Sequence, residues 1–231
     1  MAYIALDFAS SSLVPRSRSL DFRDKLLKVV VYACKLGALY NGSKKLAHIA
    51  KQISSARKIF ALLHWVKYSD DARSALVEPP GAFRAMSLLD TALTLLSDMG
   101  SDLSTLGSLG VVPLSKRHME LIDWWSTVID AAYCLVAMVT GAVGLARKQR
   151  ALAAAPPDKQ AGAQRKVTLG RLGVLKYCLD FVKDCHGAGL HGLRGEGVPA
   201  TVAITAGLLS GAISTHKWND KLAPSAKAKA G

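Results

Sequence analysis

Apolar side chains recur every three or four residues along several long segments of the chain, which is the spacing of an α-helix with one buried face. No segment keeps the alternation of apolar and polar residues that is typical of a strand. A first helix is expected over residues 22–40, capped by Asp21 and ended by the turn-forming residues 41–43. Another helix is expected from Phe83. The pattern therefore predicts an all-α protein.

The clearest apolar stripe lies in the second predicted helix, which follows the turn and runs to about residue 67. Its members step by three or four residues and are Leu46, Ile49, Ile53, Ala56, Phe60 and Leu63. Between Lys44 and Lys67 the sequence has many basic residues and no acidic one. A basic amphipathic helix of this kind is typical of a segment that lies in the headgroup plane of a membrane. A plain soluble helix with solvated lysines is the alternative reading.

We expect the apolar stripe to enter the acyl boundary and the basic residues to meet the headgroups. The predicted membrane-inserting residues are Leu46, Ile49, Ile53, Phe60 and Leu63. The predicted headgroup residues are Lys44, Lys51, Arg57 and Lys58. A helix wedged into one leaflet at a depth of roughly 5–10 Å expands that leaflet and favours positive curvature.

Two segments have the length and composition of membrane spans. Residues 126–146 carry a single charge, Asp130, and a span needs about 20 apolar residues. Aromatic and basic residues flank this segment as interface anchors, namely Trp124, Trp125, Arg147, Lys148 and Arg150. Residues 198–215 are uncharged but only just long enough, and they contain the small-residue spacing Ala203, Gly207 and Gly211 that favours close helix packing in lipid. We therefore expect an integral membrane protein with about two transmembrane helices.

The same patterns divide the chain into three regions. Residues 1–20 form a flexible leader, residues 21–112 an amphipathic helical region, and residues 113–231 a membrane-spanning region. Within the last region, residues 147–168 are expected to be a basic linker, of which 151–166 are mobile, followed by an interfacial or bundle-packed helix over 169–182.

Composition agrees with a membrane association without fixing the partner. The chain has 231 residues, which fits one compact unit, and 50% of them are hydrophobic while 20% are charged. A soluble domain usually has about 25% charged residues. The net charge is +13, and two basic ends flank an acidic middle. Such basicity suits anionic lipid or nucleic acid, but no nucleic-acid-binding motif accompanies it, so we expect anionic membrane lipids and no nucleic acid as partners.

The sequence offers no constellation that predicts catalysis. It has no Gly-rich phosphate loop, no Gly-x-Ser-x-Gly and no His-Glu-x-x-His, so we expect neither an enzyme nor a cofactor. The group Cys178, Cys185, His186 and His191 lacks the spacing of a zinc site, so no metal is expected. The few cysteines among apolar neighbours indicate a reducing compartment.

Two motifs resemble the peroxin-11 family. Residues 21–28, Asp-Phe-Arg-Asp-Lys-Leu-Leu-Lys, together with Val31 and Tyr32, resemble the opening helix of that family, and the matching positions are Arg23, Asp24, Lys25 and Tyr32. Residues 54–62, Ser-Ser-Ala-Arg-Lys-Ile-Phe-Ala-Leu, are similar to its second signature, with Ala61 where the family commonly has Arg. The segment 105–125 is similar to the one that leads into the family's first membrane span, and 207–218 resembles its C-terminal span and exit.

The resemblance implies a multi-pass protein of the peroxisomal membrane. Proteins of this family elongate the membrane before division, self-associate, and help to recruit fission adaptors and dynamin-related GTPases. A small-metabolite pore is an alternative function within the family. A soluble basic binding protein, whose apolar segments are core helices, is an alternative outside it.

Overall fold

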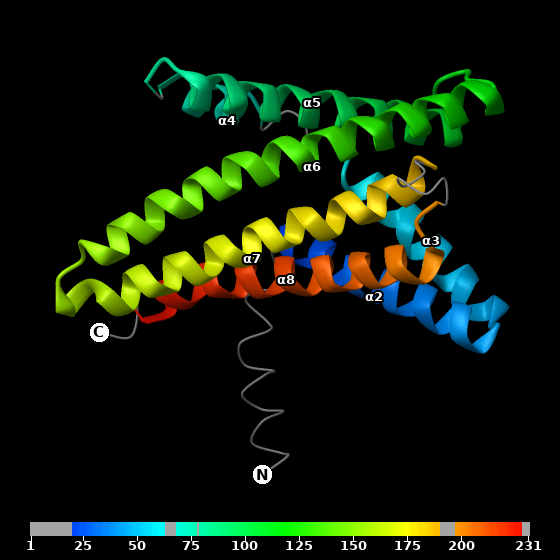
Figure 1. Cartoon of the computed structure of the whole chain (residues 1–231). Coiled ribbons are helices and arrows are strands. Elements are labelled where there is room, and N and C mark those ends of the chain that lie inside the picture. The colour runs from blue at the N-terminus through cyan, green and yellow to red at the C-terminus, as the bar shows by residue number, and fades with distance from the viewer. Residues whose placement is uncertain (1–19, 63–67, 78, 190–196, 228–231) are drawn as a thin grey trace, which may run out of the picture.

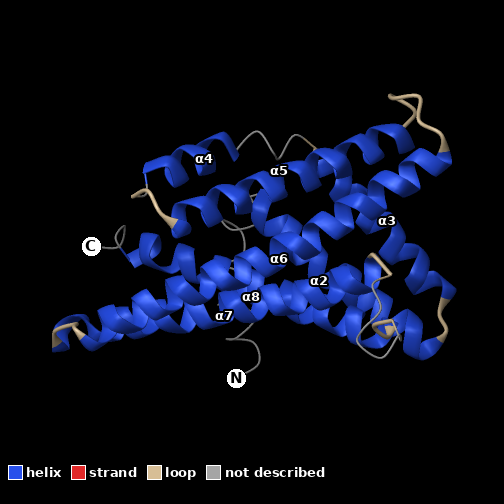
Figure 2. Ribbon diagram, turned by 45° about the horizontal axis from the view of Figure 1, so that its top comes forward, coloured by secondary structure: helices blue, strands red, loops and turns tan. Residues whose placement is uncertain are grey.

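The computed structural model describes residues 20–62, 68–77, 79–189 and 197–227 (Figure 1). Its helices are α2 (Leu20–Asn41), α3 (Lys44–Phe60), α4 (Tyr68–Val77), α5 (Ala82–Ser108), α6 (Lys116–Ala153), α7 (Pro157–Gly187) and α8 (Ala200–Lys227). The described residues contain no β-strand, and Figure 2 shows helices joined by short loops. The predicted all-α class is confirmed. The expected leader lies almost entirely outside the described residues.

The turn between α2 and α3 forms where the sequence predicts it. Gly42 has a φ of 61°, which glycine adopts without steric cost. Ser43 caps α3, because its side-chain oxygen accepts a hydrogen bond from the Leu46 backbone N–H at 3.4 Å. However, α3 ends at Phe60, earlier than expected. Leu63, the last residue of the predicted apolar stripe, lies outside the described residues.

The expected basic linker over residues 147–168 is helical instead. Helix α6 continues to Ala153 and α7 already begins at Pro157, so only a tight turn separates them. The alanine-rich stretch has high helix propensity. The proline-rich step does not prevent a new helix, because proline is well tolerated in the first turn, where its missing N–H costs no hydrogen bond.

The helices pack in a cyclic order. Among the described helices, the order of contact is α5–α6–α7–α8–α2–α3, and α3 returns to α5 through a much smaller contact. Figure 1 shows α6, α7 and α8 running side by side with α2 beyond them, while α3 crosses towards α5 and α4 lies along α5. We call the weak junction between α3 and α5 the seam.

The small residues of α8 lie in its contact with α2. A Cβ atom added at Gly207 would lie 2.5 Å from Cζ of Tyr32, and one at Gly211 would lie 3.1 Å from Cγ2 of Val29. Ala203 is buried as well. The close approach of the two helices thus occurs within one chain.

One helix in the described part of the chain, α6, is long and apolar enough to cross a membrane. Only 17% of its most apolar stretch is buried inside the protein. A second span was expected in helix α8, but no stretch of this helix is long and apolar enough to match α6. Helix α8 begins at Ala200, and its uncharged part, residues 200–215, is too short at 1.5 Å per residue to cross a hydrocarbon core of about 30 Å.

Candidate functional site

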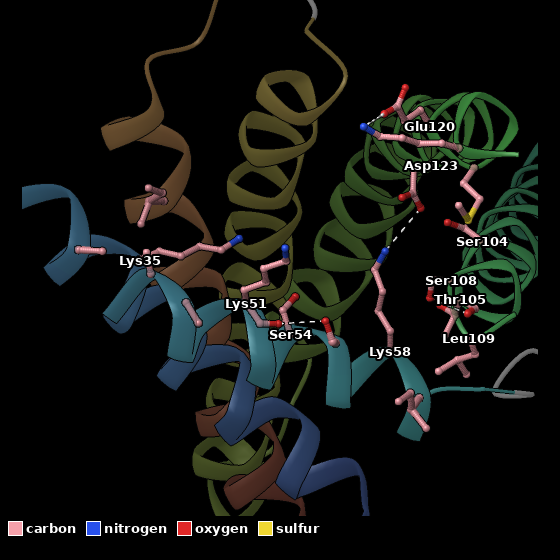
Figure 3. A pocket seen from close by; sticks show the side chains of 18 of the residues that line it. Lys35, Lys51, Ser54, Lys58, Ser104, Thr105, Ser108, Leu109, Glu120 and Asp123 are labelled. Carbon is pink, nitrogen blue, oxygen red and sulfur yellow. Dashed lines mark hydrogen bonds and ion pairs between the residues drawn. The ribbon is translucent and has the colours of Figure 1, made fainter. Parts of the chain in front are cut away.

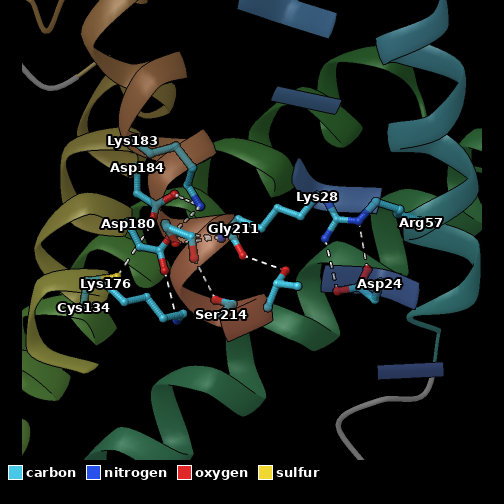
Figure 4. A network of polar contacts seen from close by, with 12 residues as sticks. Asp24, Lys28, Arg57, Cys134, Lys176, Asp180, Lys183, Asp184, Gly211 and Ser214 are labelled. Atoms are coloured by element: carbon cyan, nitrogen blue, oxygen red, sulfur yellow. Dashed lines mark hydrogen bonds and ion pairs between the residues drawn. The ribbon is translucent and has the colours of Figure 1, made fainter. Parts of the chain in front are cut away.

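Helix α3 is held on α2 by a buried face and an ion pair. Ala50 is 1% exposed in this contact, and Leu46 comes so near α2 that a Cβ atom at Gly37 would lie 3.0 Å from its Cδ1. Arg57 then forms two hydrogen bonds to the carboxylate of Asp24, from Nε at 2.9 Å and from Nη2 at 3.2 Å (Figure 4). A forked arginine–carboxylate pair fixes orientation as well as distance. The two sequence motifs therefore meet in space.

Part of the predicted membrane-inserting stripe remains exposed. Ile49 is 44% exposed and Phe60 is 71% exposed, on the same side of α3. Leu46 and Ile53 are half-buried. Some residues of the stripe therefore pack against the protein, while others face outwards. We call Ile49 and Phe60 the apolar edge of α3.

The predicted headgroup residues fall into two groups. Arg57 is bound to Asp24, and Lys58 lies 3.5 Å from the carboxylate of Asp123 on α6. Lys44 and Lys51 are exposed and have no such ion pair among the described residues. The sequence could not distinguish these groups, because their acidic partners lie in other helices.

The other family-motif residues lie along α2. Tyr32 packs on Gly207, and the Lys35 ammonium lies 5.1 Å from the centre of its ring. Arg23 is exposed and Lys25 is half-buried near the start of the helix.

A buried network of charges joins α2, α7 and α8, and sequence reasoning missed it (Figure 4). The Lys28 ammonium donates to Asp180 Oδ1 at 3.0 Å and to Ser210 Oγ at 3.1 Å, and Ser210 donates to the same carboxylate at 2.6 Å. Lys176 reaches Asp180 Oδ2 at 3.0 Å. Charged residues at regular spacing on α7 were the available signal, but their burial depends on helices far away in the sequence.

Burial and neighbouring charges shift the pKa values of this network. Burial lowers the pKa of Lys28 to about 8, although the nearby Asp180 carboxylate opposes the shift. Burial alone would raise the pKa of Asp180, but the three ammonium groups of Lys28, Lys176 and Lys183 more than offset it and hold that pKa well below its usual range. Asp180 therefore remains ionised and binds the helices together through charge.

The exposed side of α6 is apolar over several turns. Leu135, Val139 and Val143 are 48%, 46% and 39% exposed. Of the two tryptophans at its start, Trp124 donates from Nε1 to the Ala188 carbonyl at 2.9 Å, whereas Trp125 is 53% exposed. Trp125 is thus the freer interface anchor. Asp130 is half-buried.

The described residues contain no group of three or more His, Cys, Asp or Glu side chains that could hold a metal ion. His191, one of the four residues considered above, lies outside them.

Comparison with known proteins agrees with the two motifs. The family model described as Peroxisomal biogenesis factor 11 (PEX11) matches residues 11–218 of the chain. No curated protein and no solved structure matches it.

Proposed function

Because the chain belongs to the peroxisomal biogenesis factor 11 family, we propose that it remodels the peroxisomal membrane by inserting the apolar edge of α3 into one leaflet. Membership of the family gives the chain a role in peroxisome biogenesis and proliferation. The observation that carries the finer proposal is the exposure of Ile49 and Phe60 on a helix without acidic residues. The proposal involves no catalytic step.

The apolar edge works as a wedge only if α3 keeps a fixed orientation. The Arg57–Asp24 pair and the burial of Ala50 supply that orientation, so that Ile49 and Phe60 enter the acyl boundary together. The exposed Lys44 meets headgroups at the start of the same helix. Insertion of the two side chains adds area to one leaflet and thereby favours curvature.

Helix α6 supplies the anchor in this scheme. Its exposed apolar side faces lipid, and Trp125 and the basic residues at its other end lie near the two interfaces. A multi-pass arrangement, which the family resemblance implies, requires a second span. Helix α8 is short for one, so the bilayer would have to thin locally around it.

We further propose the partners that the family resemblance implies. They are anionic membrane lipids, further copies of the chain, and a fission adaptor with a dynamin-related GTPase. Self-association would concentrate the wedges on one membrane area. The small-residue face of α8 is already occupied by α2, so the copies would meet through other surfaces.

The wedge is tested with the full chain reconstituted into vesicles that contain anionic phospholipid. The variant Ile49→Glu/Phe60→Glu is compared with His48→Glu/Ser55→Glu, which places the same two carboxylates at exposed positions of the same helix, roughly 100° or more around its axis from the apolar edge. We expect electron microscopy to show tubules with the unchanged chain and with the control, and round vesicles with the first variant. Equal tubulation by all three proteins would contradict the wedge.

A further inference from the structure

An open groove lies at the seam of the bundle. Its volume is about 1030 Å³, and its walls come from α2, α3, α5, α6 and α8 (Figure 3). Ligand pockets usually measure about 300–1,000 Å³, so the groove can hold a molecule of appreciable size. It exists because α3 and α5 touch only briefly, which leaves the cyclic order of helices incompletely closed.

The walls of the groove are amphipathic. Apolar side chains from each side line it, among them Leu39, Ile59, Met119 and Ile204. Leu39 and Ile59 are each 44% exposed, so the rim is apolar as well. Hydroxyl groups of Ser54, Ser104 and Ser108 interrupt this lining. Such a surface suits a ligand with a long apolar part.

The lysines of the groove differ in their partners. Lys58 is paired with Asp123 at 3.5 Å, and Lys116 with Glu120 at 3.8 Å. Lys35 and Lys51 also line the groove, and neither has a carboxylate partner among the described residues. Figure 3 labels both side chains on the α2–α3 wall of the groove. The groove thus carries a concentrated positive charge at its α2–α3 end.

The surroundings of Lys35 make its ammonium form unfavourable on its own. Burial lowers its pKa, and the positive charges of Lys183 and Arg57 lower it further. An anion near Lys35 would raise its pKa again, because an opposite charge within a few ångströms stabilises the ammonium form.

We propose that the groove binds one molecule of an anionic phospholipid, with the phosphate between Lys35 and Lys51 and an acyl chain along the apolar walls. Two ammonium groups without carboxylate partners on one wall of the groove match a phosphate, and the apolar rim gives an acyl chain a route from the bilayer. The site depends on the membrane association described above but not on the wedge, since Lys51 and the apolar edge lie on different sides of α3. Lys51 was predicted to contact headgroups at the bilayer surface. In this proposal it contacts a lipid that is bound within the protein.

Binding is measured by native mass spectrometry and calorimetry on the full chain in detergent, with a short-chain phosphatidic acid as probe. The variant Lys35→Gln/Lys51→Gln is expected to bind about tenfold more weakly or worse, because each charge-assisted hydrogen bond is stronger than a neutral one. The control Lys45→Gln/Lys159→Gln removes the same charge at exposed positions outside the groove and should bind as the unchanged chain does. Equal losses in both variants would overturn the site.

A second pair of variants tests the acyl part. Ser55→Trp fills the groove from α3, whereas Gln52→Trp adds the same bulk to an exposed position outside it. We expect only Ser55→Trp to weaken binding, with unchanged helicity by circular dichroism in both. Unweakened binding by Ser55→Trp would exclude the groove as the place of the acyl chain.

Three other probes distinguish the chemical source of the anion. Phosphatidylcholine of equal chain length and inorganic phosphate should each bind more weakly than phosphatidic acid. If inorganic phosphate bound as tightly as phosphatidic acid, the site would be assigned to a free anion. If a glutamate-rich helical peptide displaced the lipid at a concentration below that of the lipid, the site would be assigned to an acidic protein segment. Either result overturns the proposal. Ile49→Glu/Phe60→Glu should still bind the lipid, so failure of the wedge and failure of the groove give different results.

Discussion

At the residue scale, Asp180 is the side chain on which most of the buried charge depends. Lys28 and Lys176 each lie 3.0 Å from its carboxylate, Lys183 lies 4.0 Å away, and Ser210 donates to it as well. Its side chain is 9% exposed, so these contacts are poorly screened by water. A charge that serves several helices at once is costly to remove, because its partners stay buried.

We therefore predict that Asp180→Asn destabilises the protein by about 3–5 kcal/mol, the cost of breaking a buried ion pair from one side. Asp220→Asn is the control, since Asp220 pairs with Arg165, whose side chain is 48% exposed. Such an exposed pair contributes about 0–1 kcal/mol. Denaturant unfolding followed by circular dichroism measures both, and equal losses would show that Asp180 has no special role.

The same residue gives a pH dependence with a definite sign. Because the folded pKa of Asp180 is lowered, its contribution to stability is present above the ordinary carboxyl pKa of about 4 and is lost as the pH falls through the lowered folded value. Asp184, whose pKa burial raises, acts in the opposite direction. The melting temperature of Asp180→Asn should fall less on acidification than that of the unchanged chain. A parallel fall would contradict this assignment.

At the element scale, the contact of α8 with α2 depends on the absence of a side chain at Gly207. Any Cβ atom there would overlap the ring of Tyr32, which cannot move without losing its own packing. The helices would have to separate along their whole contact.

Gly207→Ala should accordingly destabilise the protein by about 1–3 kcal/mol, as overpacking usually does. Gly144→Ala on α6 is the matched control, because nothing lies within 4 Å of a Cβ atom at that position. Alanine favours the helix by up to about 1 kcal/mol over glycine, so this control should be neutral or stabilising. Thermal unfolding of the two variants gives the comparison, and a stable Gly207→Ala would contradict the close approach.

Elements that depend on local sequence were predicted well. The turn at residues 41–43 follows from Asn, Gly and Ser, and the start of α5 follows from the prolines before it. The linker was mispredicted because proline both ends one helix and begins the next, and the short α4 was not predicted at all. For the candidate site, the sequence predicted the apolar stripe of α3. It could not predict which residues of the stripe are buried, because that depends on the contact with α2.

At the scale of the whole molecule, many large apolar side chains remain on the surface. They include the exposed turns of α6 and residues of α5 such as Leu89, Leu96 and Met99, at 48%, 55% and 46% exposure. A monomeric soluble protein rarely exposes large contiguous apolar patches. A surrounding bilayer would cover them.

The chain should consequently remain in the membrane fraction after alkaline carbonate extraction. Leu135→Lys/Val139→Lys places two charges in the middle of the proposed span and should release it, because each charge at the centre of a bilayer costs about 3 kcal/mol. Ala151→Lys/Ala153→Lys adds the same charges at exposed positions beyond the apolar stretch and should be retained. Release of the unchanged chain would favour the soluble alternative.

The cyclic order of the helices also has a consequence for biosynthesis. Among the described helices, α2 has its main packing contacts with α3 and α8, and its contact between Lys28 and Ser210 joins residues 182 positions apart. A ribosome therefore releases α2 long before its main partner exists, and so distant a contact closes late in folding. Until α8 emerges, α2 and α3 form a hairpin that chaperones or a membrane can capture. In a nascent chain that stops before α8, the face of α2 that packs on α8 would stay exposed. Quality-control factors could recognise the incomplete chain by this exposed face.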